Sequence, residues 1–291
     1  MTSIPPPRQY WSITEGTFNC LIDHPRAAAF DRAIRSAVRP GDVVVDMGSG
    51  TGVLALFAAR AGAARVYAVE HDPNNLATLS RVIEANGFAD RIQVLEGDVC
   101  TLDLPEPVDV IVGEMIATGL IEEQHVRANN NMLRFARDNA RVVLAGYTCL
   151  AGLVWSPTAY HGLTFDVVRY EYPELPELTS QPLTAEHAYA RLNLTRRVEH
   201  FDVKVQFRLQ ATAGGVVNGL RIRGVMEFHD GTTLKATPAC NYPIILPVPE
   251  SSVRPGQAFR ISLSYTLCGG FPTLTHRVAT MCPGSLGAPS R

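Results

Sequence analysis

The sequence lacks three features that would assign it quickly: a strong net charge, a long apolar run and closely spaced cysteines. Its 291 residues carry a formal net charge of -2, and the sequence pI is about 6.4. Such a chain has no general field that attracts nucleic acid or an anionic membrane. No apolar run reaches the roughly 18 residues that a membrane helix needs. The sequence therefore predicts no nucleic-acid partner and no membrane partner.

The cysteines and the N-terminal segment exclude two further classes. The six cysteines are residues 20, 100, 149, 240, 268 and 282, and they form no Cys-x-x-Cys pair and have no histidine at ligand spacing. This favours reduced thiols over a metal site or a disulfide framework. Residues 1–8 have neither the basic flank with an apolar stretch nor the cleavage site of a signal peptide. We therefore expect a cytoplasmic protein without a metal.

The first half of the chain alternates short β-branched runs with helical patterns, which is typical of βαβ units and a parallel sheet. A helix is expected over residues 53–60, and another should open at Asp72-Pro73 and close at Asn86-Gly87. The predicted strands are residues 43–46, 66–70, 92–96, 108–112 and 141–144. This half is predicted to be a Rossmann-like α/β domain.

The second half, from about Ala151 onward, alternates apolar and polar residues and is broken by Pro, Gly and Asp-Gly. The runs 201–209, 220–228 and 259–265 have the period of half-buried antiparallel strands. Residues 229–232, His-Asp-Gly-Thr, fit a tight hairpin. The predicted fold class is therefore α/β followed by β, with a C-terminal antiparallel β-barrel or sandwich.

A glycine-rich turn, Asp46-Met47-Gly48-Ser49-Gly50-Thr51-Gly52, directly follows the first predicted strand. A ligand can approach backbone N–H groups where no Cβ intervenes, and the next helix adds partial positive charge that suits a carboxylate. The third glycine comes one position too early for the pyrophosphate fingerprint of dinucleotide sites. The spacing therefore favours S-adenosylmethionine over NAD.

Acidic residues follow the next two predicted strands. Glu70 ends the second strand, where it can accept hydrogen bonds from both ribose hydroxyls, and Asp98 follows the third strand near the adenine edge, with Val99 packing on the ring. Open α/β sheets bind ligands at the carboxyl ends of their strands. The predicted site for S-adenosylmethionine, and for its product S-adenosylhomocysteine, comprises Asp46, Gly48, Ser49, Gly50, Gly52, Glu70, Asp98 and Val99.

Residues 21–26, 43–69 and 113–123 resemble the protein arginine methyltransferases. That family carries two glutamates nine positions apart on the loop after the fourth strand, and Glu114 and Glu123 have this spacing. The resemblance implies that Glu114 and Glu123 are catalytic, that Arg26 binds the cofactor carboxylate, and that a β-barrel follows the Rossmann-like domain. The residues that it places on the substrate side are Tyr10, Trp11, Met115 and Asn241.

The resemblance also suggests a division of the chain into three parts. Residues 1–38 would be a helical segment that covers cofactor and substrate, and residues 39–150 the Rossmann-like cofactor domain. Residues 151–291 would be the β-barrel-like domain for substrate binding or assembly. We expect S-adenosylmethionine to be used for methyl transfer to a guanidino group.

The glutamate pair has a physical logic of its own. A guanidinium has a pKa above 12 and arrives protonated, so its methylation requires a planar cation to be held in line with the sulfonium methyl. Two carboxylates can fix that plane and draw charge away from the attacking nitrogen. Three alternatives stay open: Glu122 and Glu123 as an exposed helix face, a non-guanidine nucleophile with His125 or Tyr10 as base, and a cofactor-binding scaffold without turnover.

The sequence departs from the family at three places. Cys20 stands where the family usually has a methionine, and residues 238–242 lack the His and Trp of the family's Thr-His-Trp loop, while Thr-His-Arg at 275–277 comes too late in the chain. Residues 165–182, where the family inserts a dimerisation arm, are short and proline-rich. We therefore expect an acceptor such as free arginine or a small guanidino compound rather than a protein tail, and we leave a homodimer open.

Overall fold

The computed structural model describes residues 14–172 and 174–281, so Tyr10, Trp11 and Cys282 lie outside the described residues. The described chain forms two compact units. The first contains the residues up to Glu114 together with residues 131–143, and we call it the Rossmann unit. The second, the β unit, contains residues 115–130 and the chain from Leu144 onward.

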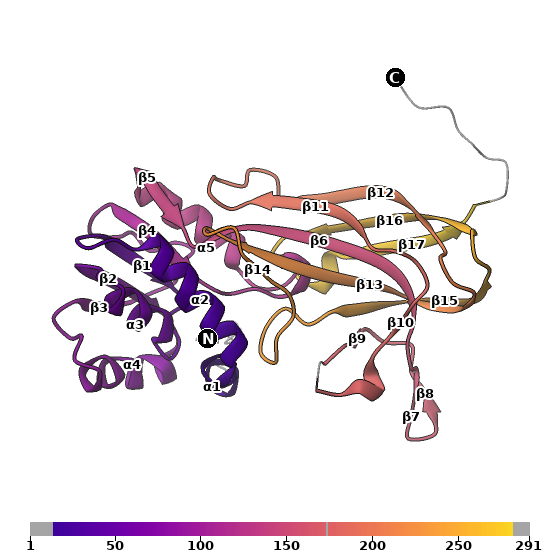
Figure 1. The fold of residues 1–291 in the computed structure, drawn as a ribbon, viewed down its shortest axis with the longest axis horizontal. Coiled ribbons are helices and arrows are strands. Elements are labelled where there is room, and N and C mark those ends of the chain that lie inside the picture. The colour runs from indigo at the N-terminus through magenta and orange to yellow at the C-terminus, as the bar shows by residue number, and fades with distance from the viewer. Residues whose placement is uncertain (1–13, 173, 282–291) are drawn as a thin grey trace, which may run out of the picture. The chain divides into compact units, whose positions relative to one another are not determined.

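The Rossmann unit is built on one parallel sheet with the strand order β3-β2-β1-β4-β5 (Figure 1). Its strands are β1 (Val43–Met47), β2 (Arg65–Glu70), β3 (Ile92–Glu96), β4 (Val108–Gly113) and β5 (Ala136–Val142). The order reverses between β1 and β4, and such a switch point is where ligands bind at the carboxyl ends of strands. The turns after these strands therefore hold the candidate site.

The α-helices among the described residues 14–114 are α1 (Thr14–Ile22), α2 (His24–Ala37), α3 (Val53–Arg60) and α4 (Pro73–Ala85). The Asp23 side chain accepts the backbone N–H of Arg26 and caps α2, and Asp72 caps α4 in the same way through Asn74. Proline near the start of each helix fits its fixed φ. Helix α2 buries an apolar stripe that contains Phe30 and Ile34.

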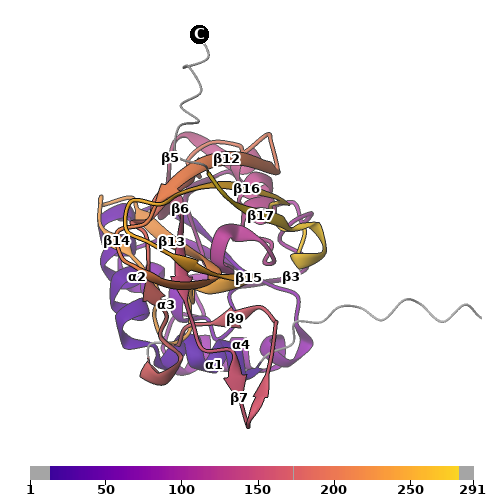
Figure 2. The same ribbon diagram turned by 90° about the vertical axis from the view of Figure 1, so that its right-hand side faces the viewer.

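The β unit consists of two larger antiparallel sheets and a small two-stranded hairpin. The seven-stranded sheet has the order β10-β6-β13-β15-β9, with β11 also paired to β6 and β14 to β13, and the three-stranded sheet has the order β12-β16-β17. Figures 1 and 2 show the three-stranded sheet on one side of the larger sheet and β7 to β9 on the other. The strands are β6 (Leu144–Trp155), β7 (Ala159–Tyr160), β8 (Leu163–Thr164), β9 (Arg169–Tyr170), β10 (Gln181–Pro182), β11 (His187–Asn193), β12 (Asp202–Gln210), β13 (Gly215–Phe228), β14 (Thr233–Leu234), β15 (Ile244–Val253), β16 (Ala258–Thr266) and β17 (Thr275–Thr280).

Short helical elements complete the described chain. They are η1 (Thr118–Leu120), α5 (His125–Met132), η2 (Leu133–Phe135), η3 (Pro176–Leu178) and η4 (Phe271–Thr273). The boundary between the two units falls within α5. Among the described residues, no helix is long and apolar enough to cross a membrane, and no cluster of His, Cys, Asp and Glu could hold a metal ion.

The predicted fold class is confirmed, because a parallel sheet with helices is followed by antiparallel sheets. The alternating runs lie in β12, β13 and β16, and residues 229–232 turn β13 back onto β14. One predicted strand was wrong: residues 141–144 are the end of β5 and the first residue of β6. Only Val143 separates the two strands, and residues 142–144 are all buried. The sequence pattern therefore does not show where the chain leaves one sheet and enters the next. The division at 38/39 and 150/151 stays a prediction.

Candidate active site

The glycine turn after β1 is closely packed and leaves little room for side chains at two of its glycines. Gly50 and Gly52 have left-handed backbone, with φ of 54° and 83°. A Cβ on Gly52 would stand 2.6 Å from Leu79 Cδ1, and one on Gly50 would stand 3.1 Å from Thr17 Cγ2 in α1. The turn also contains Gly48 and the buried Ser49. The Ser49, Gly50 and Gly52 N–H groups already donate within the unit, to Val69 O, Glu70 Oε2 and Ser49 O. The contact between this turn and the cofactor therefore stays a prediction.

Glu70 is buried at the end of β2 and binds the glycine turn directly. Its Oε2 accepts the Gly50 N–H at 2.7 Å, and its Oε1 accepts the N–H groups of His71 and Asp72, both at 2.8 Å. Three backbone donors thus fix the orientation of the carboxylate. Because a carboxylate offers about four acceptor positions, Glu70 can still accept a hydrogen bond from a ligand hydroxyl.

The turn after β3 places Asp98 and Val99 near the same edge of the sheet. Asp98 is exposed, and its Oδ1 accepts the Cys100 N–H at 2.9 Å. Val99 is buried, and its carbonyl accepts Asn131 Nδ2 at 3.0 Å. These bonds give the turn a defined shape, while the adenine contact stays a prediction.

Asp46 is the buried acid of the glycine turn. Its Oδ2 accepts the Ala55 N–H at 3.1 Å, whereas its Oδ1 has no hydrogen-bond partner among the described residues. Burial raises the pKa of Asp46 to about 6, against the opposing hydrogen bonds from Ser49 and Ala55. A buried acceptor beside glycine backbone suits a polar or cationic ligand, so these residues fit a nucleoside cofactor with a positive centre.

The raised pKa of Asp46 predicts how the stability of the cofactor-free protein depends on pH. The folded chain holds the Asp46 proton more tightly than the unfolded chain, so its stabilising contribution is present below about pH 4 and is lost as the pH rises through 6. Between these pH values, the free energy of unfolding of Asp46→Asn should rise by about 3 kcal/mol relative to wild type. Urea unfolding of both chains across this range measures the difference, and a pH-independent difference would contradict the assignment.

Glu114 follows β4 and is bound by an arginine of its own unit. Both Nε and Nη2 of Arg26 lie against Glu114 Oε2, at 2.9 and 2.7 Å, and the two side chains are only 4% and 6% exposed. Arg26 Nη1 donates to the Cys20 carbonyl at 3.1 Å, and its guanidinium lies 5.2 Å from the Phe30 ring centroid. The Glu114 carboxylate is therefore already oriented by a planar cation.

Glu123 belongs to the β unit and lies in the bend between η1 and α5. Glu123 is exposed and Glu122 is half-buried. Because α5 begins only at His125, the alternative that both glutamates form an exposed helix face was wrong. Two backbone hydrogen bonds hold the chain directly before the bend: Leu120 O accepts the Cys268 N–H at 2.9 Å, and Ile121 O accepts the Gly270 N–H at 2.8 Å.

Two buried tyrosines hold the residue at the centre of η1. Tyr147 Oη accepts the Gly119 N–H and Tyr265 Oη donates to the Gly119 carbonyl, both at 3.0 Å. Burial raises the pKa of both phenols well above the ordinary 10, so both stay protonated donors at neutral pH. The sequence analysis missed these residues, because the alternation of apolar and polar residues indicates only that their side chains face the inside of a sheet. No motif marks them.

Asn241 extends this network within the β unit. Its backbone is left-handed, with φ of 60°. Its Oδ1 accepts Tyr147 Oη at 2.6 Å and its Nδ2 donates to Gly224 O at 2.9 Å, while Thr118 Oγ1 lies 3.4 Å from Oδ1. The observed contacts of Asn241 are thus with β6, β13 and η1, and its substrate contact stays a prediction. Of the other predicted residues, Met115 is half-buried.

The alternative base His125 is fully buried at the start of α5. A general base must reach the proton that it abstracts. Complete burial therefore gives no support to proton transfer by His125. Tyr10, the other alternative base, lies outside the described residues.

Comparison with known proteins finds similar sequences over much of the chain. The model of the ribosomal protein L11 methyltransferase family (PrmA) matches residues 23–146. An uncharacterized protein of Methanocaldococcus jannaschii is 27% identical over 259 residues, covering 88% of this chain and 94% of that protein. The histone-arginine methyltransferase CARMER of Drosophila persimilis is 25% identical over 252 residues, covering 76% of this chain and 46% of that enzyme. The chain therefore spans about half the length of that enzyme.

A solved structure shares the fold over nearly the whole chain. The PRMT1 enzyme-prozyme heterotetrameric complex with AdoHcy from Trypanosoma brucei superimposes with a TM-score of 0.71 at 18% identity, covering 90% of this chain and 96% of that chain. The chain is a class I S-adenosylmethionine-dependent methyltransferase that resembles the protein arginine methyltransferases.

Proposed function

We propose that this methyltransferase transfers the methyl group to a guanidino nitrogen of arginine, free or in a small molecule. The observation that carries the proposal is the Arg26–Glu114 pair, in which Glu114 already binds a planar guanidinium while buried at the end of β4. Glu123 follows nine positions later, on a bend held by backbone hydrogen bonds. Similarity to enzymes named for arginine methylation supports the same acceptor.

The two carboxylates would act by holding the acceptor. The guanidinium arrives protonated, and acceptance of its N–H groups by Glu114 and Glu123 fixes its plane and leaves one nitrogen directed at the methyl. The cofactor supplies a methyl group on a sulfonium sulfur. Methylation requires the accepting nitrogen to lose one proton, and Glu114 or Glu123 would take it.

The cofactor would be held by the Rossmann unit. We assign the backbone of residues 48–52 and Arg26 to the methionyl end, and Glu70 to the ribose hydroxyls. Asp98 and Val99 would meet the adenine. The glycine turn, the three backbone donors on Glu70 and the unpartnered Asp46 oxygen support this assignment.

A small acceptor is favoured over a protein tail by the β unit. Asn241 occupies the place expected for the family's Thr-His-Trp loop, and its side chain is engaged in a buried network. The described residues of the range 165–182 form short strands and one 3-10 turn. A homodimer and a cytoplasmic location stay predictions.

Methyl-labelled cofactor tests the proposal on a matched panel of acceptors. L-arginine, agmatine and an arginine-rich peptide should be compared with L-citrulline and L-ornithine, which lack the guanidinium. Label should enter the small guanidines first and both control compounds not at all. If no guanidine is labelled but an amine, hydroxyl or carbon acceptor from an extract is, the result would favour a methyltransferase of a non-guanidine nucleophile. If the protein binds the cofactor and no acceptor is found, the result would favour a cofactor-binding scaffold without turnover.

The tyrosines on Gly119 provide a test of how the Glu123 bend is positioned. Tyr265→Phe removes the hydrogen bond to the Gly119 carbonyl and keeps the ring in its buried site. We expect kcat to fall about fivefold, because a single buried hydrogen bond contributes about 1 kcal/mol and the bend becomes less well fixed. Cofactor affinity should stay unchanged in calorimetry. An equal loss of cofactor affinity would instead indicate a general loss of folding.

A further inference from the structure

Three tyrosines gather on the β unit beside the bend that carries the glutamates. We call Tyr170, Tyr172 and Tyr242 the tyrosine cluster. The rings of Tyr172 and Tyr242 meet edge to face at 4.7 Å, and those of Tyr170 and Tyr172 lie 6.3 Å apart. All three keep exposed surface, so a ligand can reach them.

The pairing of β9 with β15 brings these rings together from distant parts of the chain. Tyr170 pairs with Ile244 in the sheet, and the Glu171 N–H donates to the Pro243 carbonyl at 3.0 Å. The Tyr242 carbonyl in turn accepts the Thr118 hydroxyl. The cluster is therefore joined to η1 at Thr118, which is four residues before Glu122 in the sequence.

Glu122 is a half-buried carboxylate beside this cluster. Within residues 14–172 and 174–281, its carboxylate makes no ion pair or hydrogen bond. Burial raises the pKa of Glu122, and burial together with the Glu122 charge raises the pKa of Tyr170. A partly desolvated carboxylate is stabilised by a cation, and phenol rings attract cations through their faces.

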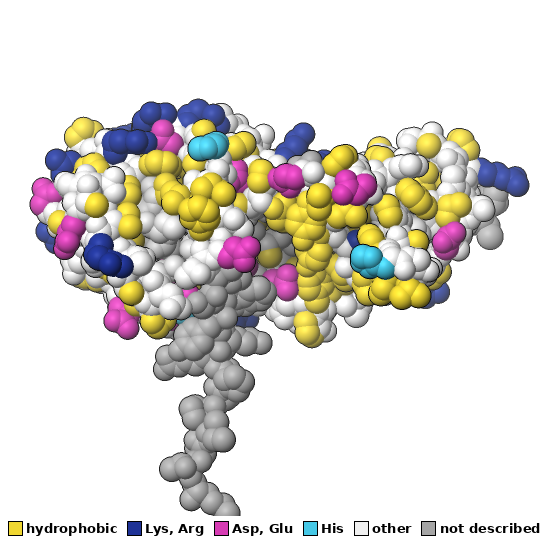
Figure 3. Space-filling model, turned by 90° about the horizontal axis from the view of Figure 1, so that it is seen from below, with side chains coloured by type: hydrophobic (Ala, Val, Ile, Leu, Met, Phe, Trp, Pro, Cys, Tyr) yellow, Lys and Arg dark blue, Asp and Glu magenta, His cyan; other side chains and the backbone are white. Residues whose placement is uncertain are grey.

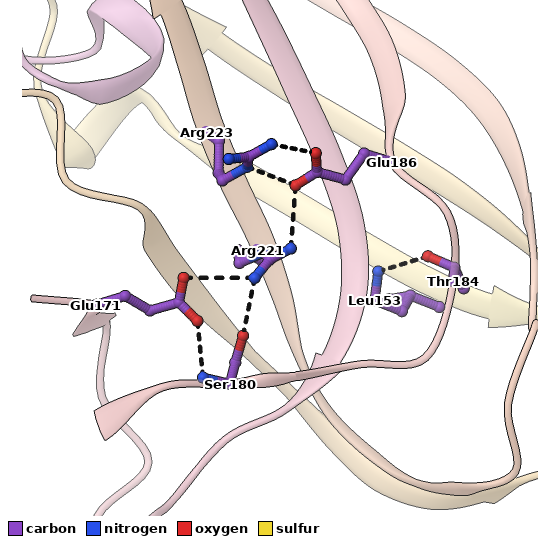
Figure 4. Close-up of polar contacts among 7 residues, drawn as sticks. All are labelled: Leu153, Glu171, Ser180, Thr184, Glu186, Arg221 and Arg223. Carbon is purple, nitrogen blue, oxygen red and sulfur yellow. Dashed lines mark hydrogen bonds and ion pairs between the residues drawn. The ribbon is translucent and has the colours of Figure 1, made fainter. Parts of the chain in front are cut away.

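The segment that carries Tyr170 and Tyr172 is fixed by a network of charges on the sheet (Figure 4). Glu171 accepts the Ser180 N–H at 2.8 Å and lies 3.4 Å from Arg221, which also contacts Glu186 at 3.1 Å. Arg223 donates to the same Glu186 at 2.6 Å. These carboxylates are already paired with arginines, whereas Glu122 is not.

Figure 3 views the molecule from the side on which β7 to β9 lie, and its β-unit half shows exposed hydrophobic side chains with acidic ones beside them. Among the exposed residues of this segment are Phe165, Val167, Tyr170 and Leu175. The surface thus combines apolar contact area with negative charge. Both properties suit an organic cation on an alkyl chain.

We propose that the tyrosine cluster and Glu122 bind a positively charged group of the methyl acceptor other than the guanidinium that is methylated. This rests on the proposed function and narrows its substrate class to acceptors with two cationic groups, an ammonium or a second guanidinium being the added one. The cluster sets specificity. It touches no reacting atom.

The preference for two charges can be measured directly. Agmatine carries a guanidinium and an ammonium, and N-acetylagmatine carries the guanidinium alone. In wild type, KM for agmatine should be about tenfold lower than for N-acetylagmatine, with similar kcat. Glu122→Gln should raise the agmatine KM about tenfold and abolish the preference, while kcat and cofactor affinity stay the same. Glu250→Gln, an exposed acid of the same unit, is the matched control.

The rings are tested separately. Tyr172→Leu should raise the agmatine KM about threefold, and Tyr172→Phe, which keeps the ring, should stay near wild type. Unchanged agmatine KM in both Glu122→Gln and Tyr172→Leu would overturn the site. Calorimetry with agmatine in the presence of S-adenosylhomocysteine separates the two proposals. If wild type binds agmatine and Glu122→Gln binds it more weakly, the cation site is supported even without turnover. If wild type does not bind agmatine, the site is overturned even if another guanidine is methylated.

Discussion

Replacement of Glu123 by glutamine is expected to lower kcat for a guanidino acceptor by about a thousandfold, because a neutral amide cannot hold the cation or take its proton. The cofactor dissociation constant should change less than about twofold, since no cofactor contact is assigned to the β unit. Glu123 is exposed on a bend outside any helix. The substitution should therefore leave the fold intact.

Single-turnover kinetics with saturating cofactor measure this effect on the chemical step. Glu250→Gln removes an exposed carboxylate from the same unit and should be fully active. Glu114→Gln is a less clean test, because it also leaves the buried Arg26 without its ion-pair partner. A Glu123→Gln enzyme with wild-type kcat would remove the two-carboxylate mechanism.

Glu70→Gln should have the second large effect, on cofactor binding. An amide must present its NH₂ group to one side, so it faces either the Gly50 N–H or the N–H groups of His71 and Asp72. We expect the cofactor dissociation constant to rise by roughly one to two orders of magnitude, and the free energy of unfolding to fall by about 2 kcal/mol.

Glu96 offers a matched control for this prediction. It is the register partner of Glu70 on β3 and is exposed. Calorimetry should give wild-type cofactor affinity for Glu96→Gln and a strong loss for Glu70→Gln. Equal affinities in the two variants would show that Glu70 does not contact the cofactor.

The sequence signals for the proposed cofactor half of the site are local. The turn 46–52 and Glu70 lie at the ends of neighbouring strands, and parallel strands bring their carboxyl ends to one edge. The helix caps Asp23 and Asp72 are likewise decided within a few residues. Such features require only the correct assignment of strands and helices.

The rest of the site depends on contacts between distant segments. Tyr265 is hydrogen-bonded to Gly119, which is 146 positions away in the sequence, and Tyr147 is hydrogen-bonded to Asn241, which is 94 positions away. A strand pattern shows which face is buried and does not show which hydroxyl meets which peptide group. The pairing of Arg26 with Glu114 was missed for the same reason, although both residues were predicted to belong to the site.

The passage from β5 to β6 shows a related limit. Both strands are buried where they meet, so residues 141–144 carry no turn signal that would separate them. The sheet to which each residue belongs is decided by its partners, Val110 and Ile111 for β5 and Phe228 for the start of β6. Strand partners are a tertiary property that periodicity does not contain.

Tandem mass spectrometry of the methylated product tests the central claim most directly. After incubation of the enzyme with cofactor and agmatine or L-arginine, the product should gain one methylene unit, and its fragments should place that unit on a guanidino nitrogen. A product that carries the added methyl on an amine, oxygen or carbon, with every guanidine unmodified, would contradict the account.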